Sequence, residues 1–440
     1  MSNPGSMGAS GISKIPELRK RILFTIFILA VYRLGAHVPT PGIDTVALAT
    51  FFEKASGTIF GVFNMFSGGA LKRFSIFALG IMPYISSSII MQLLTIVVPT
   101  LERLSKEGDL GRKRITQYTR YGTVVLCVVQ SYFIAKSLEG MRSPGGSSVV
   151  IDPGMSFRLM TILTLTTGTT FIMWLGEQIT ERGIGNGISL IIFAGIAAGL
   201  PTGFMQSVKL LQSGQITAFA AIAVLAVMLL AVAFIIFMER SQRRIPVQYA
   251  KRVIGRKMYG GQNSHLPLKL NSAGVIPPIF ASSIILFPAT IAQFSNVGIF
   301  KHLQDIMMSR SLVYNIVYVS LIIFFAYFYT AVTFNPVDVA ENLKRNGGFV
   351  PGIRPGKNTS DYIDAVLTKI TLVGALYIAA VCVLPEIMTY KFKVPFYFGG
   401  TSLLILIGVA LDTVSQIESY LLTRNYDGFI KNARLRGRRG

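Results

Sequence analysis

The sequence predicts an all-α polytopic membrane protein whose ten transmembrane helices form two inverted five-helix halves. Of its 440 residues, 51% are hydrophobic and only 14% are charged, whereas soluble proteins are about a quarter charged. Apolar runs of roughly 17 to 25 residues recur along the chain, and each is long enough to cross a hydrocarbon core about 30 Å thick. A sequence echo between two runs that lie five apart in the order indicates the inversion.

The spans and their orientation follow from the apolar runs and from the positions of Lys and Arg. The ten runs are 22–38, 74–98, 118–138, 157–176, 187–205, 217–238, 273–294, 312–334, 366–384 and 399–421. An even number of spans places both termini on one side, and the basic residues before the first span place that side in the cytoplasm. With this orientation, 29 of the 42 Lys and Arg residues fall inside, 11 fall outside and two, Arg33 and Lys369, lie within spans. The net charge of +22 is therefore typical of positive-inside topology rather than of a nucleic-acid-binding domain.

The second span has an unusual composition for a helix that faces lipid. Pro83 removes a backbone donor near its start, and four polar side chains follow where lipid would penalise them: Ser86, Ser87, Ser88 and Gln92. Ile81 and Ile85 lie one turn apart on the face that Ser88 and Gln92 continue. This face either lines other protein or a water-filled path, or belongs to a buried bundle helix with a proline kink.

The echo joins the second and seventh spans. Residues 80–85 (GIMPYI) resemble residues 274–279 (GVIPPI), and each segment is followed shortly by Ser-Ser-Ile-Ile. Because the two spans are an odd number apart, they cross the membrane in opposite directions. Proline-interrupted spans in equivalent places predict inverted halves with a functional site at their interface.

Two long cytoplasmic loops follow the sixth and eighth spans, at about 239–272 and 335–365. Both are basic and rich in Gly and Pro, and loops of this length are more often functional than mere connectors. Their charge alone is explained by topology and by contact with anionic lipids. The glycines and prolines restrict the backbone further, which favours a docking surface for a partner.

Two other function classes fit the sequence less well. A secondary transporter shares inverted repeats and broken helices, but coupling generally needs ionisable groups at the bilayer midplane, and the spans contain almost none. An intramembrane enzyme would need a catalytic motif in its spans, and the predicted spans contain neither H-E-x-x-H, nor a G-x-S-G nucleophile motif, nor paired aspartates. No nucleotide-binding motif occurs either. The three histidines lack ligand spacing and the two cysteines lie in apolar runs, so no metal site, cofactor or disulfide framework is expected. The basic N-terminus has no small-residue cleavage pattern, so no removable signal peptide is expected either.

A glycine-rich segment between the fourth and fifth spans, residues 174–189 (WLGEQITERGIGNGIS), predicts a tight cytoplasmic hairpin. Asn186 or Ser189 is able to cap the helix that follows. The segment is no dinucleotide fingerprint, because no strand precedes it. Together with the second span, residues 351–356 (PGIRPG) and residues 394–404 (VPFYFGGTSLL), it resembles the SecY family of protein-translocation channels. The resemblance runs from about residue 15 to residue 434.

The resemblance implies a central hourglass pore and assigns residues to it. The waist would be a ring of isoleucines, here called the ring isoleucines: Ile81, Ile85, Ile188, Ile192, Ile279 and Ile405. The segment 59–70, here called the plug segment, would close the outer funnel, with its centre at Asn64, Met65, Phe66, Ser67, Gly68 and Gly69. An apolar waist excludes water and ions by dewetting and selects no substrate sequence, as a conduit for arbitrary chains requires.

The resemblance also implies a lateral gate and a docking surface. The gate would lie between spans two and three and spans seven and eight, with the polar residues Ser86, Ser87, Ser88, Gln92, Ser282 and Ser283, here called the gate residues. Opposed serines would form only weak mutual hydrogen bonds, about 0.6 kcal/mol on average in membranes. Docking of the SecA motor and the ribosome would use Arg244, Lys251, Arg252, Arg256, Lys257 and Arg354, here called the docking residues.

From the resemblance we expect a protein-conducting channel in the bacterial cytoplasmic (inner) membrane, with both termini in the cytoplasm. It would pass unfolded secretory polypeptides across the membrane and release transmembrane segments sideways into lipid. Expected partners are the small subunits SecE and SecG, SecA, the ribosome, signal peptides, preproteins and anionic lipids, without nucleic-acid recognition apart from ribosome contact. The predicted organisation is a cytoplasmic N-terminus (1–21), an N-terminal half (22–208), a C-terminal half (209–422) and a basic tail (423–440).

Overall fold

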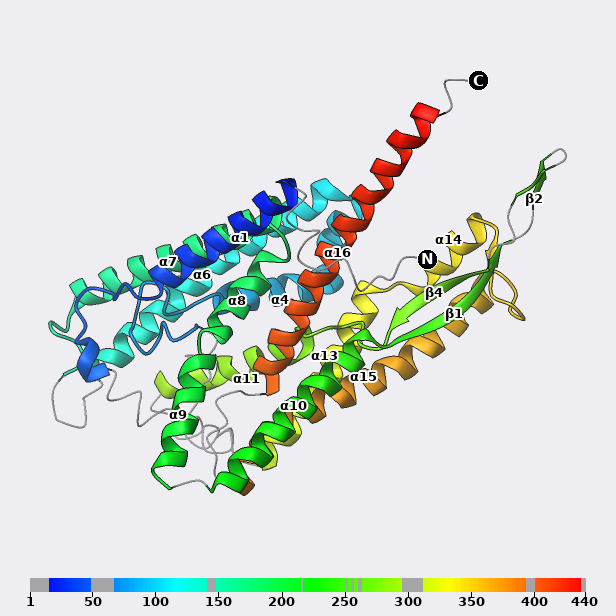
Figure 1. Ribbon diagram of the computed structural model, residues 1–440. Coiled ribbons are helices and arrows are strands. Elements are labelled where there is room, and N and C mark those ends of the chain that lie inside the picture. Colours follow the sequence, from blue (N-terminus) through cyan, green and yellow to red (C-terminus); the bar gives the residue numbers. More distant parts are fainter. Residues whose placement is uncertain are drawn as a thin grey trace. The chain divides into compact units, whose positions relative to one another are not determined.

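The computed structural model describes residues 16–48, 67–140, 148–214, 217–249, 252–254, 257–259, 263–294, 312–392 and 400–436 (Figure 1). Two compact units make up the chain. Unit 1 contains residues 1–205, 290–304 and 409–440, and unit 2 contains residues 206–289 and 305–408. The boundaries fall within helices α9, α11 and α16, and each unit is described here by itself.

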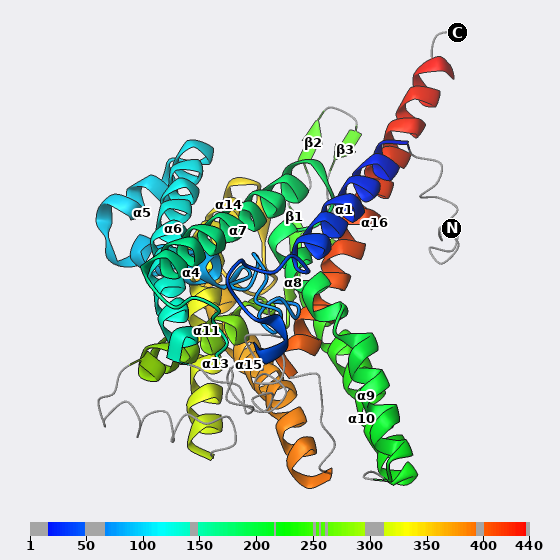
Figure 2. The same cartoon turned by 90° about the vertical axis from the view of Figure 1, so that its left-hand side faces the viewer.

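Unit 1 is built from helices that pack against one another. It contains α1 (Pro16–Gly35), α4 (Met82–Val97), α5 (Pro99–Lys106), α6 (Asp109–Gly140), α7 (Met155–Arg182), α8 (Gly187–Ala197) and the start of α9 (Leu200–Gln212). Helices α6 and α7 run side by side, α4 packs on α6, and α1 packs on both α7 and α8 (Figure 2). Small side chains spaced four residues apart on α6, including Thr123, Cys127 and Ser131, are fully buried and let the helices approach closely.

Unit 2 combines long helices with strands. Its elements are α10 (Ala218–Arg240), β1 (Gln242–Tyr249), β2 (Arg252–Ile254), β3 (Lys257–Tyr259), β4 (Asn263–Lys269), α11 (Ile276–Phe294), α13 (Leu312–Thr333), α14 (Pro336–Arg345), β5 (Gly348–Phe349), α15 (Lys357–Phe392) and the start of α16 (Gly400–Arg436). Strands β4, β1 and β5 form an antiparallel sheet in that order, and β2 pairs with β3. Helix α15 contacts α10, α13 and α14.

The ten predicted spans are confirmed as helices, since each overlaps a helix of the described residues. Among those residues, seven helices are long and apolar enough to cross a membrane, or eight if α4 and α5 count as one span bent by 100°. Helix α1 overlaps the first predicted span but is not one of these seven helices. Helix α11 is not one of them either, because its apolar stretch, Ile276–Ile285, is shorter.

The predicted start of the second span is wrong, and so is the alternative of a proline kink. Residues 74–81 form turns, and α4 begins only at Met82. Pro83 therefore lies in the first turn of the helix, where its missing N–H has no intrahelical partner to lose. The sharp bend comes at the other end, where Pro99 opens α5.

The echo between the second and seventh spans has a structural counterpart. Gly80 and Gly274 both have positive φ, 57° and 62°, and each lies two residues before its helix, α4 or α11. Glycine adopts this left-handed conformation without the steric cost that a Cβ imposes. The two halves thus use the same turn to enter equivalent helices.

Candidate functional sites

The described end of the plug segment packs against α1 and α8 within unit 1. Arg33 donates a hydrogen bond from Nη1 to the carbonyl oxygen of Gly68 at 3.0 Å, and the Tyr32 hydroxyl lies 3.5 Å from the carbonyl oxygen of Ser67. Gly68 has φ +65°, and a Cβ added to it would meet the Cα of Gly195 on α8 at 2.8 Å. Only a glycine at position 68 fits this contact. Asn64, Met65 and Phe66 lie outside the described residues.

The turns that follow the plug segment are held by buried aromatic side chains. Phe74 and Phe77 are each 1% exposed, and the ring of Phe77 stacks on Tyr32 with centroids 5.9 Å apart. The backbone N–H of Thr40 donates to the carbonyl oxygen of Phe74 at 2.8 Å. These contacts fix the chain between the plug segment and α4, so that α4 starts from a rigid base.

The ring isoleucines lie near the beginnings of four helices. Ile81 and Ile85 lie at the start of α4, and Ile188 and Ile192 lie in α8, all in unit 1. Ile279 in α11 and Ile405 in α16 belong to unit 2. All are buried except Ile188, which is half-buried. Because its members belong to two units, the ring stays a prediction.

Five of the six gate residues, all except Ser86, have hydrogen bonds shown inside their own units. The Ser87 hydroxyl donates to the carbonyl oxygen of Thr119 on α6 at 2.8 Å, and Gly122 leaves the space that this serine needs. The hydroxyls of Ser282 and Ser283 both donate to the carbonyl oxygen of Ile279 in their own helix. Gln92 donates to Ser88, one turn away on α4. Each of these hydrogen bonds lies within one unit, so the mutual bonds expected across the gate stay a prediction.

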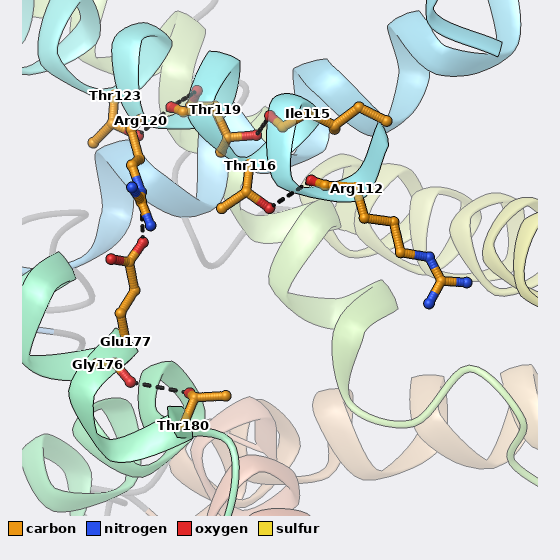
Figure 3. A network of polar contacts seen from close by, with 10 residues as sticks. Arg112, Ile115, Thr116, Thr119, Arg120, Thr123, Gly176, Glu177 and Thr180 are labelled. Carbon is orange, nitrogen blue, oxygen red and sulfur yellow. Dashed lines mark hydrogen bonds and ion pairs between the residues drawn. The ribbon is translucent and has the colours of Figure 1, made fainter. Parts of the chain in front are cut away.

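An ion pair connects α6 and α7 on the predicted cytoplasmic side. Arg120 donates from Nε to the Glu177 carboxylate at 2.7 Å (Figure 3). In the same region Thr119 and Thr123 bond to carbonyl oxygens of their own helix, which satisfies their hydroxyls (Figure 3). The sequence reasoning missed this pair, because it considered charges at span ends only as topology signals.

The hairpin between α7 and α8 has the predicted cap. The Asn186 side chain accepts hydrogen bonds from the backbone N–H groups of Ile188 and Ser189, so Asn186 is the cap and Ser189 is not. Gly185, at φ +87°, donates its N–H to the Gln416 side chain on α16. The hairpin is therefore tied to another helix of unit 1 as well as to its own.

The two long loops of the predicted docking surface join in one sheet, which the sequence reasoning did not predict. Strand β5, from the second loop, pairs with β1, from the first, at Gln248↔Phe349 and Tyr249↔Gly348. The apolar residues Ile245 and Val247 lie two positions apart along β1, and this spacing could have predicted a strand. In the structure they are each 2% exposed, while Arg244 and Pro246 beside them face solvent. The buried face packs on a cluster that includes Val350 and Ile363.

Two of the docking residues have described side chains. Arg244 on β1 and Arg354 after β5 are both exposed, and the Arg354 carbonyl oxygen accepts a hydrogen bond from Thr359 at 2.9 Å. Arg252 and Lys257 lie on the strand pair β2 and β3. Lys251 and Arg256 lie outside the described residues. The glycines at 352 and 356 have positive φ and shape the turn that presents Arg354.

In the part of the chain that the structure describes, no group of three or more His, Cys, Asp or Glu side chains could hold a metal ion. Cys127 and Cys382 are both buried and do not form a disulfide.

Comparison with known proteins identifies the family. The family model described as SecY matches residues 75–414. The protein translocase subunit SecY of Escherichia coli (strain K12) is 53% identical over 439 residues, which is 99% of this chain and 98% of that protein. The chain belongs to the SecY family. Its fold also matches a solved structure described as that of a protein conducting channel, with a TM-score of 0.64 at 15% identity and with 96% of this chain and 98% of that one covered.

A second solved structure, Sec61 in the canine ribosome–channel complex from the endoplasmic reticulum, matches with a TM-score of 0.60 at 14% identity, covering 96% of this chain and 97% of that one. SecY membership makes the chain a multi-pass membrane protein of a channel family, not of an enzyme family. The transporter and intramembrane-enzyme alternatives are thereby set aside.

Proposed function

We propose that this chain is the protein-conducting channel of a bacterial Sec translocase. It passes unfolded secretory polypeptides across the cytoplasmic membrane and releases transmembrane segments sideways into lipid. The observation that carries the proposal is 53% identity to a SecY translocase subunit over almost the whole of both chains. The ring isoleucines would form the waist, the plug segment would close it, and the gate residues would border the lateral exit.

The physical features of the chain support a conduit without chemistry of its own. The ring positions carry only isoleucine. An apolar waist excludes water and ions by dewetting until a polypeptide enters it. The chain carries no nucleotide-binding motif, so the energy for transport has to come from a partner. The proposed sources are the SecA ATPase and the translating ribosome, which would dock on the docking residues. SecE and SecG are the proposed small subunits.

The sheet β4–β1–β5 supports this docking role. It unites the two basic loops on one packed base, with Arg244 and Arg354 exposed. Sec61, whose fold this chain shares, is described in a ribosome–channel complex. For orientation, we propose that both termini and this sheet lie in the cytoplasm, as the distribution of Lys and Arg indicates.

Transport in reconstituted vesicles tests the proposal. Vesicles that contain this chain with SecE and SecG should import a secretory precursor when SecA and ATP are added, measured as protection of the precursor from external protease. Vesicles without the chain are the control. Import that is equal with and without the chain would contradict the proposal.

A further inference from the structure

The connection between β4 and α11 in unit 2 is held by hydrogen bonds to neighbouring elements. It comprises residues 270–275, here called the junction, and it links the last residue of β4, Lys269, to the first residue of α11, Ile276. Along the chain, a displacement of β4 reaches the start of α11 through these six residues.

Asn271 closes the junction on itself and ties it to α10. Its side-chain amide Nδ2 donates to the Glu239 carboxylate at 2.6 Å and to the carbonyl oxygen of Gly274 at 3.1 Å. The second bond spans the turn that Gly274 makes at φ +62° just before α11. Asn271 is only 6% exposed, so its amide hydrogens would be costly to leave without acceptors.

Glu239, in the last turn of α10, accepts a second hydrogen bond on Oε1, the oxygen that also accepts from Asn271. The hydroxyl of Tyr377, on α15, donates to Glu239 Oε1 at 3.2 Å, and the ring of Phe234 packs edge-on against that tyrosine. Tyr377 is 5% exposed and Glu239 is half-buried. A charged acceptor that collects two donors in a partly buried place makes stronger bonds than a neutral one. The carboxylate therefore joins α10, α15 and the junction.

Backbone contacts also hold the junction against the end of α10 and against α15. The N–H of Leu270 donates to the carbonyl oxygen of Ser241 at 3.0 Å, which extends the β1–β4 ladder to the end of α10. Gly374 on α15 lies directly beneath, and a Cβ added there would meet the Leu270 carbonyl oxygen at 2.7 Å. The junction thus lies flat on α15 at a position that admits no side chain.

We propose that Glu239 is a positioning residue. By holding Asn271 in place it keeps the junction rigid, so that the junction couples the sheet β4–β1–β5 to α11. The inference rests on the proposed function, in which α11 belongs to the lateral gate and partners dock on the sheet. A rigid junction transmits a displacement of β4 to α11, whereas a loosened junction absorbs it. Glu239 acts through Asn271 and does not itself contact the polypeptide in transit.

Three variants separate this role from alternatives. Glu239→Leu removes the acceptor and should uncouple the sheet from α11, whereas Glu239→Gln keeps an acceptor oxygen and should retain most of the coupling. Gly374→Ala displaces the Leu270 backbone and leaves the side chains of Glu239, Asn271 and Tyr377 unchanged, so it should reproduce the effect of Glu239→Leu. Ser272→Ala is the matched control, because the Ser272 hydroxyl is in the junction but donates only to the carbonyl oxygen of Lys269.

The measurement is the response of α11 to motor docking in the full complex. An environment-sensitive fluorophore at position 284, an exposed position of α11, is read before and after addition of SecA, together with the affinity of SecA for the same vesicles. We expect the fluorescence change per bound SecA to fall at least fivefold in Glu239→Leu and Gly374→Ala, and less than twofold in Glu239→Gln and Ser272→Ala. The affinity for SecA should stay within twofold in all four.

Two results would overturn the inference. One is a full fluorescence response in Glu239→Leu, and the other is a loss of response that only follows a loss of SecA affinity, which would make Glu239 part of the docking surface. A failed proposed function looks different, because the unsubstituted chain itself would then show no response to bound SecA.

Discussion

Removing the Arg33 side chain should release the plug segment. Arg33 is half-buried and donates to the Gly68 carbonyl oxygen at 3.0 Å, at the described end of the plug segment. A hydrogen bond from a charged donor contributes about 1.5–3 kcal/mol, and partial exposure argues for the lower end. A loss of about 1.5 kcal/mol raises the released population roughly tenfold. Arg33→Leu should therefore raise the resting ion conductance of the channel about tenfold.

The assay is the current through resting channels in planar bilayers, with no motor or precursor present. Tyr32→Phe is the matched control, because the Tyr32 hydroxyl lies 3.5 Å from its acceptor and that bond is at the limit of a useful length. Its current should stay within twofold of the unsubstituted channel, and Arg33→Lys should fall between the two. Equal currents in Arg33→Leu and Tyr32→Phe would refute the reasoning and leave the plug segment without this tie.

Three further predictions concern the ring, the docking surface and the hairpin. Changing all six ring isoleucines to serine should wet the waist and raise the resting conductance, so a current no higher than that of the unsubstituted channel would contradict the ring. Arg354→Glu should sharply reduce SecA-dependent import while Lys357→Glu, also exposed, should hardly change it, whereas equal and mild losses would indicate contact with lipid head groups instead. Asn186→Ala should lower the free energy of unfolding by about 1 kcal/mol through loss of the cap of α8, and a thermal unfolding midpoint equal to that of Ser189→Ala would argue against the cap.

The helices could be predicted from the sequence because their signal is local. A run of apolar residues long enough to cross the bilayer must satisfy its own backbone hydrogen bonds, so length and composition suffice to predict a helix. The Asn186 cap was predictable for the same reason, since a cap bonds to backbone groups only two or three residues away.

The sheet was missed because its pairing is not local. Strand β5 pairs with β1 across about a hundred residues of sequence, and neither segment is apolar throughout. The start of α4 was misplaced because residues 74–81 are as apolar as the helix that follows, although their contacts with α1 hold them in turns. The contacts of the junction were not predicted either, because Glu239, Asn271 and Tyr377 come from three separate segments of the sequence.

The partners of the candidate site residues depend on tertiary packing that composition does not reveal. No local pattern pairs Ser87 with Thr119, and its hydroxyl bonds there because Gly122 opens the necessary space on α6. Arg33 was noted only as a charge in a span, and its role became visible once Gly68 was placed beside it. In both cases a glycine far along the chain decides the contact.

The central claim, that a polypeptide passes through this chain at the ring isoleucines, can be tested by site-specific crosslinking. A photoreactive amino acid is placed at position 81, 188, 279 or 405 in turn, and a secretory precursor is arrested partway through reconstituted vesicles. Positions 225 and 229, exposed on α10, serve as controls. We expect crosslinks from the arrested segment to all four ring positions and to neither control. Crosslinks to the controls that equal those to the ring would contradict it.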